Sequence, residues 1–339
     1  MEKLLQELSD LRGISGFEYR IAENIEGRFR EFTDDVRIDP LGSVIACKKS
    51  NRPNAPKLMI EAHMDEIGLM VKEIDEKGFI TFVNVGGVDP RILPAAEVVV
   101  HGTRDIPGII GAKPPHLQSA EESKQSIQIK DMAIDTGYSY DEISKLVSVG
   151  DSISLSQSSG VLLNRRFSGK TLDDRAGVAI LLDVLSKIDF DLSADIYMVS
   201  AVQEEVGCRG AKPAAYSIMP DAAIVIDVCH GITPDNSENA FEIGSGTVIS
   251  LGPNIHPELS KRLIELAERQ EIPHELDVDG DDTGTDAWAI QVARDGIPTA
   301  LLSIPLKYMH TSVETLDIAD VEATSALILA FIKEYGLEG

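Results

Sequence analysis

The sequence predicts an α/β fold, in which a mixed sheet is flanked by helices and a small β-rich domain is inserted. Two patterns support this prediction. Over most of the chain, short apolar runs of strand length alternate with stretches of helical periodicity, an order that builds a sheet covered on both faces. From about residue 70 to about residue 160, short β-type runs between glycine and proline turns replace that pattern.

The larger unit is predicted element by element. Residues 1–35 are expected to be mainly helical, because Leu4, Leu5, Leu8 and Leu11 recur at helical spacing before Gly13. A helix over 173–188 opens with acids, which suit a helix N-terminus. Further helices are expected over 260–270 and from about 321 to 335. The apolar runs 58–62, 196–202, 223–228 and 299–304 predict four core strands.

The middle segment predicts a separate unit. Its runs FITFVNV, AEVVVHG, SIQIK and DSISL are short and rich in β-branched residues. Such an insertion is tolerated because the ends of a domain tend to lie close together. We therefore expect residues 1–69 and 162–339 to form one discontinuous domain, and residues 70–161 to form an inserted β-barrel-like domain.

Composition excludes several classes of protein. Of the 339 residues, 43% are hydrophobic and 26% are charged, which is typical of a globular chain. The 56 acids and 31 basic residues give a formal charge of −25, which disfavours nucleic acid and anionic membranes as partners. No apolar run approaches the roughly 18 residues that span a bilayer. Three widely spaced cysteines and the absence of a signal-peptide pattern indicate a cytoplasmic protein.

Side chains that bind metals follow each of the four core strands. Asp173 opens the helix over 173–188, and the other candidates follow the strands. In chain order, the candidates are His63, Asp65, Asp173, Glu204, Glu205, Asp227 and His310. Ligands of open α/β sheets bind at the carboxyl ends of the strands. Each residue alone is better explained as a helix cap, a solvated loop acid or a packed histidine, but their shared position favours one converging site.

This set of side chains suits a pair of metal ions. Two imidazoles and three carboxylates can hold two zinc-like ions when one carboxylate bridges them, and such a pair activates water and polarises a carbonyl. Adjacent Glu204 and Glu205 suggest that one binds metal and the other takes a proton. Because His63 and Asp65 alternate in an extended segment, they share a face, and Asp65 can orient the ring of His63.

Six segments, in order, carry a family resemblance. EAHMDEIG (61–68), LDDRAGV (172–178), QEEVG (203–207), IDV (226–228), GTDA (284–287) and YMHTSVE (308–314) closely resemble the dinuclear metallo-aminopeptidases of the tetrahedral aminopeptidase family. That family includes bacterial glutamyl aminopeptidases and members labelled cellulase or endoglucanase. The segments GGVDPRILPAAEV, GIIGAKPPHL and VSVGD resemble the family's β-rich dimerisation domain.

The resemblance implies specific roles. His63 and Asp227 would bind one metal ion, Glu205 and His310 the other, and Asp173, in preference to Asp174, would bridge both. Glu204 would be the general base and then the proton donor to the leaving amine, and Asp65 would hold His63. The implied cofactor is two divalent ions per subunit, with zinc preferred over cobalt or manganese. One departure is Lys307, where many relatives carry arginine, whose planar fork lysine lacks.

The resemblance also implies peptide substrates and a homo-oligomer, a dimer formed through the inserted domain that often assembles into a dodecamer. His116, within this domain, is expected to be a structural loop residue, although the family likeness leaves open a role near substrate across an interface. Cys208 is expected to pack beside the centre, His230 to line its rim, and Thr285 and Trp288 to shape the substrate pocket.

Two other functions compete with the aminopeptidase. A glycoside hydrolase can use paired carboxylates, but aromatic residues, which often flank sugars, are only 5% of the chain, and the two histidines would have no purpose. A non-catalytic metal-binding assembly protein would not need Glu204 as an unligated base. We therefore expect a metal-dependent aminopeptidase.

Overall fold

The computed structural model describes residues 1–111, 113–119 and 127–337. Its largest element is an eight-stranded sheet with the strand order β1-β2-β12-β3-β13-β16-β14-β15. The strands are β1 (Asp35–Ile38), β2 (Val44–Lys48), β3 (Lys57–His63), β12 (Asp195–Ala201), β13 (Ala222–His230), β14 (Thr247–Leu251), β15 (His274–Val278) and β16 (Thr299–Leu306). The four central strands β12, β3, β13 and β16 are parallel. The pairs β1–β2, β2–β12 and β14–β16 are antiparallel, and β14 pairs with β15 in parallel.

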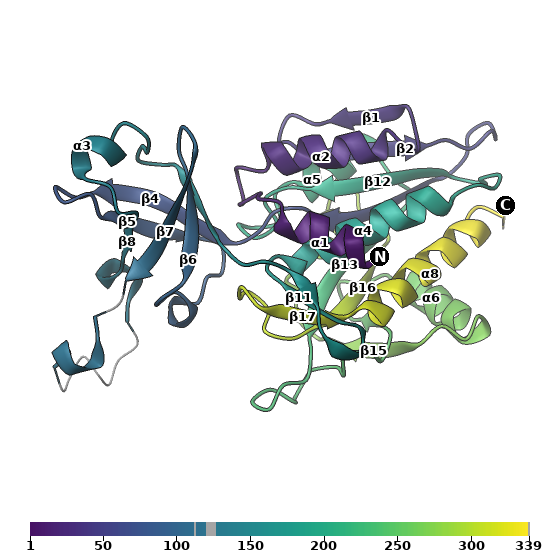
Figure 1. The fold of residues 1–339 in the computed structure, drawn as a ribbon. Coiled ribbons are helices and arrows are strands. Elements are labelled where there is room, and N and C mark those ends of the chain that lie inside the picture. Colours follow the sequence, from purple (N-terminus) through teal and green to yellow (C-terminus); the bar gives the residue numbers. More distant parts are fainter. Residues whose placement is uncertain (112, 120–126, 338–339) are drawn as a thin grey trace.

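Helices cover both faces of this sheet (Figure 1). One face packs against α1 (Glu2–Asp10), α2 (Tyr19–Phe29), α4 (Leu172–Lys187), α6 (Pro257–Arg269) and α8 (Ile318–Glu334). The other face packs against α5 (Ala211–Ile218) and α7 (Asp286–Gln291). The expected α/β class, a mixed sheet flanked by helices, is confirmed.

Burial explains the pattern of apolar residues in the central strands and helices. Strand β3 is buried along almost its whole length, so its apolar residues form a continuous run instead of alternating with polar ones. Helix α4 is buried along most of its length because it lies between β3, β13, α1 and α8, and its middle is apolar around the whole helix. Helix α6 lies at the surface and buries only one stripe, which includes Leu259, Leu263 and Leu266.

A separate closed barrel lies to one side of the sheet (Figure 1). Its strands follow the order β4 (Gly68–Ile74), β5 (Ile80–Val85), β8 (Ala133–Asp135), β7 (Asp105–Gly111), β6 (Glu97–His101) and β9 (Ser152–Leu155). The barrel has its own apolar core, which includes Leu69, Phe82, Val100 and Ile134. The small β-rich domain expected from the sequence is therefore present as a barrel.

Shorter elements complete the chain. Strands β10 (Gly160–Val161), β11 (Arg166–Gly169) and β17 (Glu314–Asp317) form a small antiparallel sheet. The remaining elements are the helix α3 (Tyr140–Ile143) and the 3₁₀ turns η1 (Pro90–Ile92), η2 (Pro115–Leu117), η4 (Ile129–Asp131) and η5 (Leu163–Arg165). Across the described ranges, none of the helices combines the length and the apolar character needed to traverse a bilayer.

Candidate functional site

Two groups of metal-binding side chains lie near the carboxyl ends of the central strands and share one residue. The first group is His63, Asp173 and Asp227, and the second is Asp173, Glu205 and His310. Within each group, one potential ligand atom from every residue lies within 4.8 Å of the others. The structure thus brings all five expected ligands together, with Asp173 common to both groups.

Asp173 lies at the N-terminal end of α4, between the two histidines. Its Oδ1 is 3.1 Å from His63 Nε2, and its Oδ2 is 3.3 Å from His310 Nε2. Burial alone would raise the pKa of Asp173, but hydrogen bonds from His310 and His63 lower it below the usual value. Both oxygens of Asp174 lie near Gly177, and its Oδ1 accepts a hydrogen bond from the Gly177 amide within the helix. The two oxygens of Asp173 therefore face both halves of the site.

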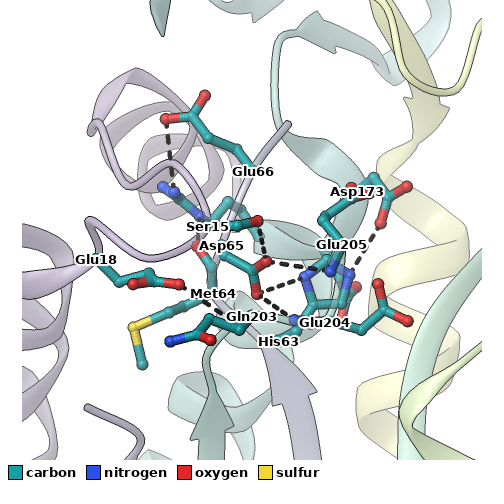
Figure 2. Close-up of polar contacts among 12 residues, drawn as sticks. Ser15, Glu18, His63, Met64, Asp65, Glu66, Asp173, Gln203, Glu204 and Glu205 are labelled. Carbon is teal, nitrogen blue, oxygen red and sulfur yellow. Dashed lines mark hydrogen bonds and ion pairs between the residues drawn. The ribbon is translucent and has the colours of Figure 1, made fainter. Parts of the chain in front are cut away.

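Asp65 contacts His63, Ser15 and the backbone of Glu204 and Glu205, as Figure 2 shows. Its Oδ1 lies 3.5 Å from His63 Nδ1, the ring nitrogen opposite the one that faces Asp173. The carboxylate also accepts hydrogen bonds from the Ser15 hydroxyl at 2.6 Å and from the backbone amides of Glu204 and Glu205 at 3.0 and 3.2 Å. One fully buried carboxylate thus lies beside the ring of His63 and accepts hydrogen bonds from the loop after β12.

His310 is held by contacts from two directions. Its Nδ1 lies 3.2 Å from the backbone oxygen of Gly87, in the barrel, and its Nε2 lies 3.4 Å from Glu205 Oε2. A Cβ at Gly87 would lie 2.7 Å from His310 Nδ1, so only glycine fits this close approach. The hydrogen bond with Asp173 raises the pKa of His310 to about 9, despite partial burial. The barrel therefore contributes to the position of a candidate ligand.

Glu314 contacts the backbone of two candidate ligands. Its side chain is 2% exposed and accepts hydrogen bonds from the backbone amides of Asp173 at 3.1 Å and His310 at 2.9 Å. The sequence reading assigned it no role, although it ends the motif YMHTSVE. Burial raises the pKa of Glu314 to about 8, and the charge of Asp173 contributes. Its position four residues after the candidate ligand His310, inside the same motif, was the signal in the sequence that could have identified it.

Glu204 belongs to neither of these two groups, but it forms a third group with Cys208 and Asp286, in which one potential ligand atom from each residue lies within 4.8 Å of the others. Its Oε1 accepts a hydrogen bond from the thiol of Cys208 at 3.2 Å. It also lies close to Asp286, the first residue of α7, which the sequence reading did not single out. Burial raises the pKa of Glu204, and the charge of Asp173 contributes. The carboxylate is therefore near the centre and available for proton transfer.

Buried charged residues next to the site make hydrogen bonds that fix the surrounding backbone. Glu66 accepts a hydrogen bond from Lys170 Nζ at 2.7 Å and another from the Gly13 amide at 2.8 Å. The guanidinium of Arg175, which is fully buried, donates to the backbone oxygens of Met64 and Leu8. These contacts hold the segment after β3 against α1 and α4. Sequence reasoning missed them because it cannot show which charges are buried.

The chemistry of the donor set fits divalent cations. Burial raises the pKa of Glu205 to about 9 and that of Asp227 well above its usual value, and the charge of Asp173 adds to both shifts. Among the described residues, the ion pairs of Asp173 and Glu205 are made with the two histidines, and neither lysine nor arginine pairs with these acids. Buried carboxylates that crowd one another without a basic partner are what a metal ion would neutralise.

A cavity of about 690 Å³ opens beside these residues. Its walls include Cys208, His230, Thr285 and Trp288, the residues expected near the centre or the substrate pocket. His116 lies in η2 of the barrel unit and Lys307 follows β16, and in the described part of the chain neither lines the cavity. The cavity is therefore the natural place for a substrate that reaches the centre.

Comparisons with known proteins agree with this site. The sequence model of the M42 glutamyl aminopeptidase family matches residues 42–327. The lysyl aminopeptidase of Pyrococcus furiosus is 36% identical over 340 residues, covering 98% of this chain and 96% of that protein. The structure of the aminopeptidase APDkam598 from Desulfurococcus kamchatkensis is 34% identical, with a TM-score of 0.92 over 99% of this chain and 97% of that one.

A third match concerns assembly. The TET1 peptidase of Pyrococcus horikoshii, which can form a tetrahedron or a large octahedral shell, is 34% identical, with a TM-score of 0.86 over 97% of this chain and 98% of that one. These matches span nearly the whole chain and confirm the expected enzyme class, a metal-dependent aminopeptidase that hydrolyses peptide bonds. The chain belongs to the M42 glutamyl aminopeptidase family.

Proposed function

We propose that this aminopeptidase works through a dinuclear metal centre, with Glu204 as its general base. The proposed ligands are His63 and Asp227 for one ion, Glu205 and His310 for the other, and Asp173 for both. The observation that carries the proposal is the sharing of Asp173 between two groups of potential ligands. Zinc suits imidazole and carboxylate ligands best, and cobalt or manganese could take the same set.

In this proposal, Glu204 and Asp65 have different roles beside the metal ions. When bound, two divalent ions lower the pKa of water and polarise the first peptide carbonyl of the substrate. Glu204 takes the proton from the attacking water and returns it to the leaving amine. Asp65 keeps the ring of His63 and the backbone of Glu204 and Glu205 in place.

The substitution Glu204→Gln tests the assigned base. We expect kcat on amino-acid nitroanilides to fall by about 100- to 10,000-fold, because the amide cannot accept the proton. Metal analysis of the same protein should still find two ions, since Glu204 is not a proposed ligand. Retained activity with both ions bound would show that another group is the base. Hydrolysis of glucans but not of peptides by the unaltered enzyme would contradict the proposed reaction itself.

We also propose that the chain divides its tasks between two units and forms homo-oligomers. Residues 1–69 and 162–339 would form the catalytic unit, and residues 70–161 the unit that joins two subunits and supports a dodecamer. The barrel unit exposes large apolar side chains, including Ile109 (54%), Leu117 (60%) and Val149 (70%), which is typical of an interaction surface when they gather. The shells of the TET1 relative support the same proposal.

Sedimentation velocity with and without added zinc tests this assembly. We expect a dimer or a dodecamer, and we expect Val149→Glu to shift the distribution toward smaller species, because a charge would be buried at the interface. A monomer under all conditions would contradict the proposal.

A further inference from the structure

Acidic side chains gather in the cavity at the end away from the metal centre. Asp277 on β15 and Asp279, Asp281 and Asp282 in the loop after it all line the same cavity as Asp173, Glu204, Glu205 and Asp227. Two divalent ions would offset the four acids of the centre. Among the described residues, neither lysine nor arginine lines the cavity, so the four far acids have no basic neighbour there.

The sheet provides a polar floor between the two ends. In the strand registers, Asp227 pairs with Ser303, and Ser250 pairs with Asp277. Paired residues on adjacent strands point to the same face, and all four line the cavity. Three strand spacings separate β13 from β15, or about 14 Å. A substrate held at the centre would therefore need a long side chain to reach Asp277.

Two hydroxyls lie on this floor. Ser250 and Ser303 are each only 3% exposed, and both line the cavity. Within the described residues, neither side chain makes a hydrogen bond. Neither oxygen is among the side-chain atoms that are shielded from solvent without a partner, so both open onto the cavity and can accept a hydrogen bond from a ligand.

The far end suits a cation on an apolar stem. Leu251 and Trp288 line the cavity together with the acids and can contact methylene groups. Burial raises the pKa of Asp277, and the charge of nearby Asp279 adds to the shift, so a cation placed there would relieve repulsion. A glutamate side chain would instead meet like charges.

We infer that this end of the cavity selects peptides with a basic N-terminal residue, lysine or arginine, and that Asp277 is the main specificity-determining residue. The inference rests on the proposed function, because it places the reacting peptide bond at the metal centre. An ammonium or guanidinium group would donate hydrogen bonds to Asp277 and to the free hydroxyls, while the metals hold the backbone of the same residue. The charge of the substrate side chain, and not its size alone, would then set the rate.

The test compares the nitroanilides of lysine, norleucine and glutamate, because norleucine keeps the four-carbon stem of lysine without its charge. With metal-reconstituted enzyme, we expect kcat/KM to be about tenfold or more higher for lysine than for norleucine, and lowest for glutamate. Asp277→Asn should lower the lysine-to-norleucine ratio about tenfold. The matched control is Glu275→Gln on the same strand, which removes the same charge outside the cavity and should leave the ratio unchanged.

A second readout separates binding from turnover. By calorimetry, Lys-Ala should bind the Glu204→Gln protein more tightly than norleucyl-Ala, and Asp277→Asn in that protein should remove the difference. Equal rates for lysine and norleucine, or equal losses for both in Asp277→Asn, would overturn the inference while leaving the aminopeptidase intact. Failure of the unaltered enzyme to cleave any of the nitroanilides would overturn the proposed function and the inference with it.

Discussion

The two ends of the cavity use the same kind of side chain under different conditions. At the metal centre, Asp65 and Asp173 are at least 94% buried, and each is held by contacts from several directions. At the far end, Asp277 is only partly buried and Asp281 and Asp282 are exposed. Burial and fixed partners give a carboxylate the geometry for a metal, whereas partial exposure leaves it free to attract a mobile cation.

This difference explains why the acidic composition alone says little about function. The proposed centre uses five of the 56 acids, namely Asp65, Asp173, Glu204, Glu205 and Asp227. Position distinguishes these acids from the rest, and their number does not: three follow the ends of strands, Asp227 lies near the end of β13, and Asp173 lies at the start of α4. The large negative charge is instead a property of the whole surface, which favours solubility.

The largest effect that we expect comes from Asp173→Asn. Loss of one charged oxygen removes the proposed bridge, so the protein should retain fewer than two ions per subunit. Activity should fall by about 1,000-fold or more, beyond the roughly 10- to 100-fold cost of changing a residue that only supports a ligand. Metal analysis and nitroanilide kinetics measure both. The comparison variant Asp174→Asn, whose carboxylate faces Gly177, should keep both ions; the reverse result would make Asp174 the bridge.

A smaller effect is expected from Asp65→Asn at the same end. The substitution keeps the shape but weakens the contacts with His63 and with the backbone of Glu204 and Glu205. We expect metal affinity or kcat to fall by about 10- to 100-fold. Competition with a chelator gives the affinity, and an unchanged value for both quantities would show that Asp65 has no supporting role.

The smallest effect belongs to the far end. Asp277→Asn should change rates about tenfold, only for basic substrates, and without loss of metal. Higher salt should reduce this preference, because partly exposed charges are screened, and should affect the buried centre much less. A loss of metal in this variant would show that the two ends are not independent.

The sequence was sufficient to predict the parallel core of the sheet and the residues at its carboxyl edge. Buried parallel strands appear as apolar runs, so β3, β12, β13 and β16 could be recognised, and the polar residue after each run marked the candidate site. The choice of Asp173 over Asp174 rested on family likeness, because two adjacent acids at a helix start cannot be told apart by periodicity.

Other features required the three-dimensional structure. The carboxylate of Glu314 accepts a hydrogen bond from the backbone amide of His310, and the backbone oxygen of Gly87 lies 3.2 Å from the ring Nδ1 of His310. No sequence pattern reports such contacts. Likewise, Ser250 and Asp277 lie side by side on one face of the sheet only because of the register between β14 and β15. These strands are short and have weak apolar patterns. Sequence periodicity does not predict contacts that depend on strand register or on backbone atoms.

Anomalous diffraction from crystals of zinc-loaded protein tests the central claim most directly. We expect two strong peaks that flank Asp173, one within reach of His63 and Asp227 and the other within reach of Glu205 and His310. Data collected at the zinc absorption edge would identify both ions. A single peak, or peaks elsewhere in the molecule with these five side chains unligated, would contradict the dinuclear centre.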